Sequence, residues 1–105
     1  GSIEGLRLAE PPAHAHNNHW MYALQIDPRY GRDKNELIGL FRKENIEVRP
    51  LWYLNHRQRP YERCQVHAIK KALHLWETTL NLPCSVNLQK KDIHHITELL
   101  KKWKK

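Results

Sequence analysis

Apolar and polar residues alternate from position 20 to 26, and a period of two is the pattern of a half-buried β-strand. One face of this predicted strand carries Trp20, Tyr22, Leu24 and Ile26. Asp27-Pro28 follows, a dipeptide typical of a turn, so we expect the strand to end there. The segment 20–26 is therefore the first strand of a predicted sheet.

Three later segments space their apolar residues at the 3.6-residue period of an α-helix. The first follows Asp33, a favourable N-cap residue, and ends at Asn45. The second is predicted over residues 66–80 and the third over residues 89–103. Their core-facing residues are Leu37, Ile38, Leu40 and Phe41 in the first helix, Val66, Ile69, Leu73, Trp76 and Leu80 in the second, and Ile93, Ile96, Leu100 and Trp103 in the third.

Two further strands are predicted between these helices, over residues 46–52 and, more briefly, over residues 81–85. Pro50 must lie where the sheet needs no backbone N–H, and Pro83 cuts the short strand off. The first 18 residues contain Pro11-Pro12 and no sustained periodicity, so they are either a linker or an arriving strand.

The order of these elements predicts the fold class. Strand, helix, strand, loop, helix, short strand and helix indicate an α+β fold, an α/β sandwich in which about three helices cover a small sheet. Gly1-Ser2 is typical of residues left by cloning. We therefore assign residues 1–15 to this remnant and a linker, and residues 16–105 to one domain. A chain of 105 residues with 40% hydrophobic residues can bury one modest core.

The net charge of +7 is concentrated near the C-terminus. The last 18 residues carry six lysines against Asp92 and Glu98, which leaves a balance of +4 in this segment. Such a tail is either a solvated helix end that complements the helix dipole or a patch that binds phosphates.

Two absences in the sequence bear on location. No apolar run approaches the roughly 20 residues that a membrane-spanning helix needs. Cys64 and Cys84 lie far apart without CxxC spacing, which favours a reducing, cytoplasmic setting over a disulfide framework.

The richest candidate chemistry lies in the stretch that follows the predicted strand 46–52. Trp52, Tyr53, Asn55 and His56 place two aromatic rings, an amide and an imidazole within five residues. Rings supply contact area and the polar tips supply direction, a combination suited to a polar ligand with a flat surface. The alternative interpretation is an aromatic plug over a small core.

Other patterns are weaker. His14, His16 and His19 cluster near the start, but no cysteine or carboxylate pattern joins them, which favours structural or exposed histidines over zinc ligands. The four glycines never cluster into a phosphate-binding loop, and no GxSxG nucleophile elbow is present. The residues therefore predict part of a binding surface, with no catalytic residue and no metal site.

Three ordered segments carry a resemblance to a known family: residues 17–26, residues 46–56 and residues 80–88. They contain a strand with its turn, an Arg-Pro-aromatic-Tyr-x-x-His stretch from Arg49 to His56, and a Leu-Pro-x-x-x-x-Leu stretch from Leu82 to Leu88. The chain from about residue 15 onward resembles the C-terminal small domain of the DegT/DnrJ/EryC1/StrS aminotransferases. Within this family, the sequence of these segments is most similar to that of enzymes of the legionaminic-acid and related nonulosonic-acid pathways.

This resemblance implies an aspartate aminotransferase-like fold and a function. The family consists of pyridoxal-phosphate enzymes that aminate keto groups on nucleotide-linked sugars, with glutamate the expected amino donor. The full-length enzyme is expected to be a cytoplasmic homodimer that binds neither nucleic acid nor membrane. The Schiff-base lysine lies in a large N-terminal domain, so neither Lys70 nor Lys71 is a candidate for it. We expect no cofactor-binding residue in this chain and no activity from it alone.

The resemblance also implies which residues meet the substrate. Tyr53 and His56 match the Tyr and His of the family's stretch and would contact the sugar nucleotide, with Trp52 and Asn55 as neighbours. Arg49 either holds a carboxylate of the other domain or is an exposed strand residue. His19 and Trp20 either line the same cleft or pack in the sheet.

Two competing functions remain open from the sequence. One is a small basic nucleic-acid-binding module, in which the lysine tail contacts phosphates and Trp52, Tyr53 and Tyr61 stack on bases. The other is a freestanding protein-interaction domain without a ligand.

Overall fold

Four antiparallel strands form one sheet in the computed structural model, which describes residues 2–105. The strands are β1 (Leu6–Leu8), β2 (Tyr22–Ile26), β3 (Arg49–Pro50) and β4 (Thr79–Leu82), and their order in the sheet is β1-β2-β4-β3. The last strand in the sequence, β4, lies between β2 and β3. Leu80 of β4 therefore pairs with Leu24 on one side, and Asn81 of β4 pairs with Arg49 on the other. The predicted α+β class is confirmed.

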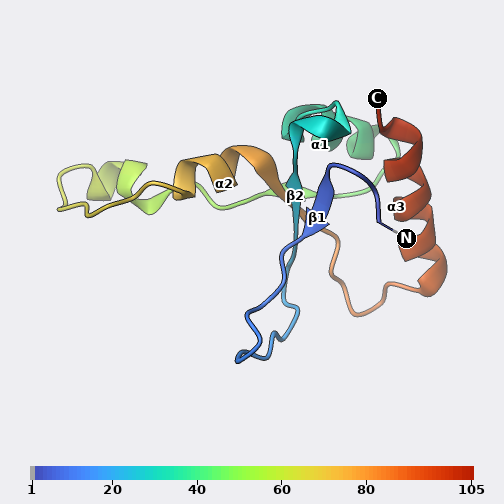
Figure 1. The fold of residues 1–105 in the computed structure, drawn as a ribbon, viewed down its shortest axis with the longest axis horizontal. Helices are drawn as coiled ribbons and strands as arrows, with labels where there is room; N and C mark the ends of the chain where they lie inside the picture. Colours follow the sequence, from blue (N-terminus) through green and yellow to red (C-terminus); the bar gives the residue numbers. More distant parts are fainter. Residues whose placement is uncertain (1) are drawn as a thin grey trace.

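Three α-helices accompany the sheet: α1 (Lys34–Lys43), α2 (Ala72–Thr78) and α3 (Lys90–Trp103). Short 3-10 turns lie at Pro28–Tyr30, Asn55–Arg57 and Arg59–Tyr61. In Figure 1, α1 and α3 lie close to the strands, whereas α2 and the loop before it extend away from them. The molecule therefore has a packed body, from which α2 with the loop before it and the connection between β1 and β2 both project.

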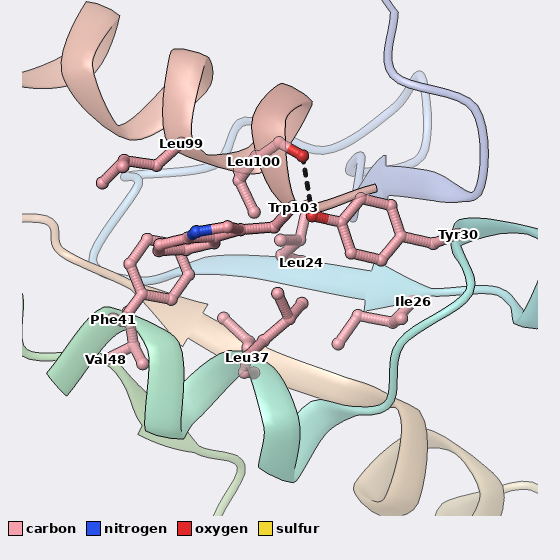
Figure 2. Packing of buried hydrophobic residues seen from close by; sticks show 10 residues of the cluster. Leu24, Ile26, Tyr30, Leu37, Phe41, Val48, Leu99, Leu100 and Trp103 are labelled. Carbon is pink, nitrogen blue, oxygen red and sulfur yellow. Dashed lines mark hydrogen bonds between the residues drawn. The ribbon is translucent and has the colours of Figure 1, made fainter. Parts of the chain in front are cut away.

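The core lies where α1 and α3 meet one face of the sheet. Figure 2 shows the Phe41 and Trp103 side chains meeting between these helices, with ring centroids 4.9 Å apart in an edge-to-face arrangement. The buried apolar cluster consists of Leu24, Ile26, Tyr30, Leu37, Phe41, Val48, Leu80, Leu99, Leu100 and Trp103. Alternation along β2 buries Leu24 and Ile26, as the period of two predicts.

The ends of α1 follow the sequence signals. The Asp33 side chain accepts a hydrogen bond from the Glu36 backbone N–H, and the Glu36 side chain accepts one from Asp33, which completes a capping box. Asn45 adopts a left-handed conformation with φ 57° just beyond the helix, which a short polar side chain tolerates. The predicted first and third helices are both confirmed as α1 and α3, but Ile93, which was predicted to face the core, is 56% exposed.

The predicted second helix is wrong over much of its length. Residues 66–71 are not helical, and Leu80 belongs to β4 instead. Val66 and Ile69, assigned to the core, are 48% and 45% exposed. A helical spacing of apolar residues stabilises a helix only when a packing surface buries them, and the body offers none this far out.

The strand predicted over residues 46–52 shrinks to Arg49–Pro50. Pro50 lies on an edge strand, as its missing N–H requires, and the chain then turns away from the sheet. The strand predicted over residues 81–85 begins earlier, at Thr79, and ends just before Pro83. The N-terminal segment was expected to be a linker or an arriving strand, and Leu6–Leu8 pair with β2, so the strand interpretation holds for these three residues and the assignment of residues 1–15 to a remnant and linker does not.

Tyr30 allows a test of the core by pH. Its fully buried hydroxyl donates a hydrogen bond of 2.7 Å to the Leu100 carbonyl, and burial raises the pKa of Tyr30 to about 12. The folded protein thus favours the neutral phenol, so this contribution to stability is present below pH 10 and is lost as the pH rises towards 12.

We expect Tyr30→Phe to lower the free energy of unfolding by about 1 kcal/mol at neutral pH, because the Leu100 carbonyl loses its donor. Above pH 10 the wild type should lose stability faster than the variant. Urea unfolding at pH 7 and pH 11 measures both effects. Parallel pH profiles for the two proteins would contradict this assignment.

Candidate functional site

Residues 51–78 leave the sheet after β3 and return to it at β4, and we call this segment the arm. Figure 1 shows the arm projecting from the body, with α2 as its returning limb. Every residue from 61 to 71 is exposed. Trp52, Tyr53, Asn55 and His56, the predicted site residues of the loop, all lie on the outgoing limb.

An aromatic pair joins the two limbs of the arm. The Tyr53 ring contacts the Trp76 ring of α2 edge to face, with centroids 5.5 Å apart and planes inclined at 76°. Such pairs contribute about 0.5–1.5 kcal/mol beyond the area they bury. Tyr53 nevertheless remains 48% exposed, so part of its side chain is accessible to a ligand.

Trp76 is held in turn by a lysine of the body. Lys34, the first residue of α1, donates a hydrogen bond from Nζ to the Trp76 carbonyl and places the same ammonium 4.3 Å from the centroid of the Trp76 ring. Lys34 is only 7% exposed. Burial lowers the pKa of Lys34, while the carboxylates of Glu77 and Asp33 oppose that shift.

Trp52 meets a segment that is distant in sequence. Trp20 lies in the connection between β1 and β2. The centroids of the Trp52 and Trp20 rings are 5.5 Å apart, and the ring planes are inclined at 31°. Beside it, His19 stacks on Tyr22 at 5.3 Å. Trp52 is 60% and Trp20 67% exposed, so the pair forms an open aromatic surface rather than a core plug.

Gln58 organises the polar part of the outgoing limb. Its Nε2 donates to the Tyr53 carbonyl at 3.1 Å and to Asn55 Oδ1 at 3.2 Å. Asn55 and His56 lie in the 3-10 turn Asn55–Arg57, where Asn55 is exposed and His56 is partly buried. This turn therefore presents an amide and an imidazole close to the Tyr53 backbone.

Arg49 lies apart from the arm, beside a cleft. In β3 its guanidinium forms an exposed ion pair with Glu47, with Nη2 2.7 Å from Oε1. It lines a cleft of about 850 Å³ together with His19, Trp20 and Cys84, whereas Trp52, Tyr53, Asn55 and His56 do not line it. The predicted site thus falls into two groups, and Arg49 uses a carboxylate of its own chain.

Sequence reasoning missed three residues that the structure brings to these places. Trp76 was expected in a core stripe, and nothing in the sequence distinguishes Lys34 from a solvated lysine in a first helical turn. Asn81 lines the cleft and is 3% exposed, yet none of residues 2–105 forms a hydrogen bond with its side-chain amide. The sequence feature that could have revealed Asn81 is its position as a polar residue between Leu80 and Leu82, which places it on the sheet face opposite the core.

The described residues do not suit pyridoxal phosphate. A Schiff-base lysine must be buried beside groups that hold the cofactor. Lys34 is the buried lysine of residues 2–105, but its ammonium is occupied by the Trp76 carbonyl and ring. Lys70 and Lys71 are exposed and lie before α2 rather than on it.

The described part of the chain contains neither a candidate metal site nor a helix that could span a membrane. His14, His16 and His19 do not join with further histidine, cysteine or carboxylate side chains into a group of three or more that could hold a metal ion. No helix between residues 2 and 105 is both long and apolar enough to cross a membrane.

Comparison with known proteins decides the family. The model of the DegT/DnrJ/EryC1/StrS aminotransferase family matches residues 2–101. The chain belongs to this family. Members are aminotransferases that depend on pyridoxal phosphate, so the resemblance seen in the three sequence segments is confirmed at this level. A comparison with curated proteins found no match.

Solved structures of sugar aminotransferases have the same fold over this chain. DesI in the presence of its TDP-sugar product is 25% identical, with a TM-score of 0.80 over 94% of this chain. CalS13 from Micromonospora echinospora and TlmJ from Streptoalloteichus hindustanus are each 17% identical, with TM-scores of 0.77 and 0.79 over 95% and 97% of this chain. This chain spans 26%, 26% and 27% of these three proteins, respectively.

Proposed function

We propose that this chain is the C-terminal small domain of an aminotransferase that transfers an amino group to a nucleotide-linked keto sugar. The observation that carries the proposal is the match to DesI, a structure determined with its TDP-sugar product, over 94% of this chain. Family membership over residues 2–101 supports the reaction class. Such a reaction serves the synthesis of amino sugars for cell-surface polysaccharides.

In this proposal the arm supplies the substrate side of the active site. The Tyr53 hydroxyl and the His56 imidazole orient sugar hydroxyls or phosphate oxygens, because both groups are hydrogen-bonding tips on accessible side chains. The exposed Trp52 ring offers a flat apolar surface to the pyranose. Asn55 adds an amide beside them, and Arg49 at the neighbouring cleft adds a positive charge.

The chain alone is not catalytic in this proposal. Pyridoxal phosphate and its Schiff-base lysine belong to the remainder of a full-length enzyme, since the three sugar aminotransferases are about four times longer than the matching part. We further propose glutamate as the amino donor, a homodimer as the assembly, the cytoplasm as the location and a pathway of the legionaminic-acid type. The free thiols of Cys64 and Cys84 suit a reducing compartment.

The test is amination itself. The full-length enzyme is expected to convert a nucleotide-linked keto sugar and glutamate into an amino sugar nucleotide and 2-oxoglutarate, measured by mass change of the sugar nucleotide. This chain supplied with pyridoxal phosphate, sugar and glutamate should form no product. Product from the chain alone would overturn its assignment as the substrate half.

A further inference from the structure

Lys34 is unusual because its charged side chain is buried in the protein instead of being exposed to water. It is 7% exposed, and burial lowers the pKa of Lys34 while the carboxylates of Glu77 and Asp33 oppose that shift. Fully buried lysines are rare unless they are paired. Both close contacts of its Nζ are instead made to Trp76.

The two contacts act on different parts of Trp76. The carbonyl of Trp76 lies in the last turn of α2, where carbonyl groups lack partners within the helix and the helix dipole favours a positive charge. The ring of Trp76 meets the ammonium at 4.3 Å, within the range of a cation–π interaction. One ammonium therefore fixes both the backbone and the side chain of the same residue.

The base of this contact is rigid. Lys34 follows Asp33, whose capping box fixes the first turn of α1, and the helix is anchored by Leu37 and Phe41, both 0% exposed. Residues 61–71 of the arm are all exposed, and its other aromatic contact with the body, Trp52 on Trp20, is open to solvent. The contact of α2 with the first turn of α1 therefore helps to set where the arm lies on the body.

Trp76 passes this constraint to the candidate site. Its ring is in contact with the Lys34 ammonium and, at 5.5 Å between centroids, with the Tyr53 ring. Tyr53 is half exposed and lies in a segment without helix or strand, so its ring has few other constraints. The order Lys34, Trp76, Tyr53 links a buried helix end to a proposed sugar-contacting group.

We propose that Lys34 is a positioning residue that holds Trp76 from two sides and thereby fixes the Tyr53 ring relative to the sheet. Only the naming of Tyr53 as a substrate group rests on the proposed function. The clamp itself is a property of the chain, and it is tested without any ligand.

The test compares Lys34→Met, Lys34→Arg and Lys43→Met in the 105-residue chain. Methionine keeps the length and apolar stem but removes the charge and the N–H donors, whereas arginine keeps both. Lys43 is an exposed lysine at the other end of α1 and serves as the matched control. NMR records the NOEs between the Tyr53 and Trp76 rings, and hydrogen exchange records the amides of α2, β2 and α3.

Lys34→Met is expected to lose the ring-to-ring NOEs and to exchange the Leu75 amide, which bonds to the Lys71 carbonyl, about tenfold faster. Exchange at Leu24 and Leu100 in the body should stay unchanged, and Lys34→Arg and Lys43→Met should behave as the wild type. Retained NOEs in Lys34→Met would overturn the proposal. So would a general loss of protection in the body, because the proposal assigns Lys34 an effect on the arm alone.

In the full-length enzyme, Lys34→Met is expected to raise the KM for the keto sugar about tenfold, more than it lowers kcat, because a loosened Tyr53 weakens sugar binding. Rescue by Lys34→Arg is expected. An unchanged KM together with lost NOEs would refute the link to substrate. An enzyme that aminates no sugar nucleotide would refute the proposed function and leave the clamp result standing.

Discussion

Full-length enzyme carrying His56→Ala or Tyr53→Phe is expected to keep its cofactor and to lose kcat/KM for the keto sugar by roughly 10- to 100-fold. Each change removes one hydrogen-bonding group that we propose to contact the sugar nucleotide, and such a bond contributes about 1.5–3 kcal/mol when one partner is charged. A difference of about 1.4 kcal/mol corresponds to a tenfold change in rate. Steady-state kinetics and the absorbance of bound cofactor measure the two quantities separately.

A matched control exists on the same arm. Tyr61 is 49% exposed in the neighbouring turn Arg59–Tyr61, close to the 48% of Tyr53, but its ring is not part of the contact with Trp76. Tyr61→Phe removes an equivalent hydroxyl and should leave kcat/KM within about twofold, as expected for an exposed surface change. Unchanged kinetics in both His56→Ala and Tyr53→Phe would remove these residues from the site.

Phe41→Ala is expected to lower the free energy of unfolding by about 3–5 kcal/mol, because deleting a buried phenyl ring loses its transfer free energy and leaves a cavity. Phe41 is 0% exposed and forms the edge-to-face contact that joins α1 to Trp103 of α3. Loss on this scale is a large fraction of the stability of a small domain. Urea unfolding followed by circular dichroism gives the measurement.

Ile93→Ala provides the comparison within α3. The 3.6-residue spacing placed Ile93 in the core, but it is 56% exposed. Its truncation should therefore cost less than about 1 kcal/mol. Equal losses for Phe41→Ala and Ile93→Ala would show that the core has been placed wrongly.

Local signals predicted much of the fold because they act within a few residues. Asp33 caps its own helix through Glu36, and Asn45 ends it through its own backbone conformation. Alternation in β2 predicts which face meets the helices, and burial of Leu24 and Ile26 follows. These features need no knowledge of distant contacts.

The failures have the opposite cause. Val66 and Ile69 have helical spacing, but whether a helix forms there depends on a surface that the arm leaves behind. Residues 46–52 read as a full strand, although only a two-residue edge pairs with β4. In both segments the secondary structure depends on a packing or pairing partner that is remote in sequence or absent from this part of the molecule.

The candidate site shows the same division. Trp52, Tyr53, Asn55 and His56 lie within five residues of sequence, so their grouping could be predicted from the local sequence alone. The contacts of Trp52 with Trp20 and of Tyr53 with Trp76 join segments more than 20 residues apart, and no local pattern indicates them. The contact of Lys34 with Trp76 is likewise between segments distant in sequence.

The proposed specificity for nucleotide-linked keto sugars is tested by a substrate comparison with the full-length enzyme and glutamate. A panel of TDP- and UDP-linked keto sugars is offered beside the corresponding free sugars and simple 2-oxo acids, and each product is identified by mass spectrometry. We expect amination of at least one nucleotide-linked keto sugar and of none of the free sugars, since the arm is proposed to bind the sugar nucleotide. Amination of the 2-oxo acids alone, with every sugar nucleotide left unchanged, would contradict the proposed specificity.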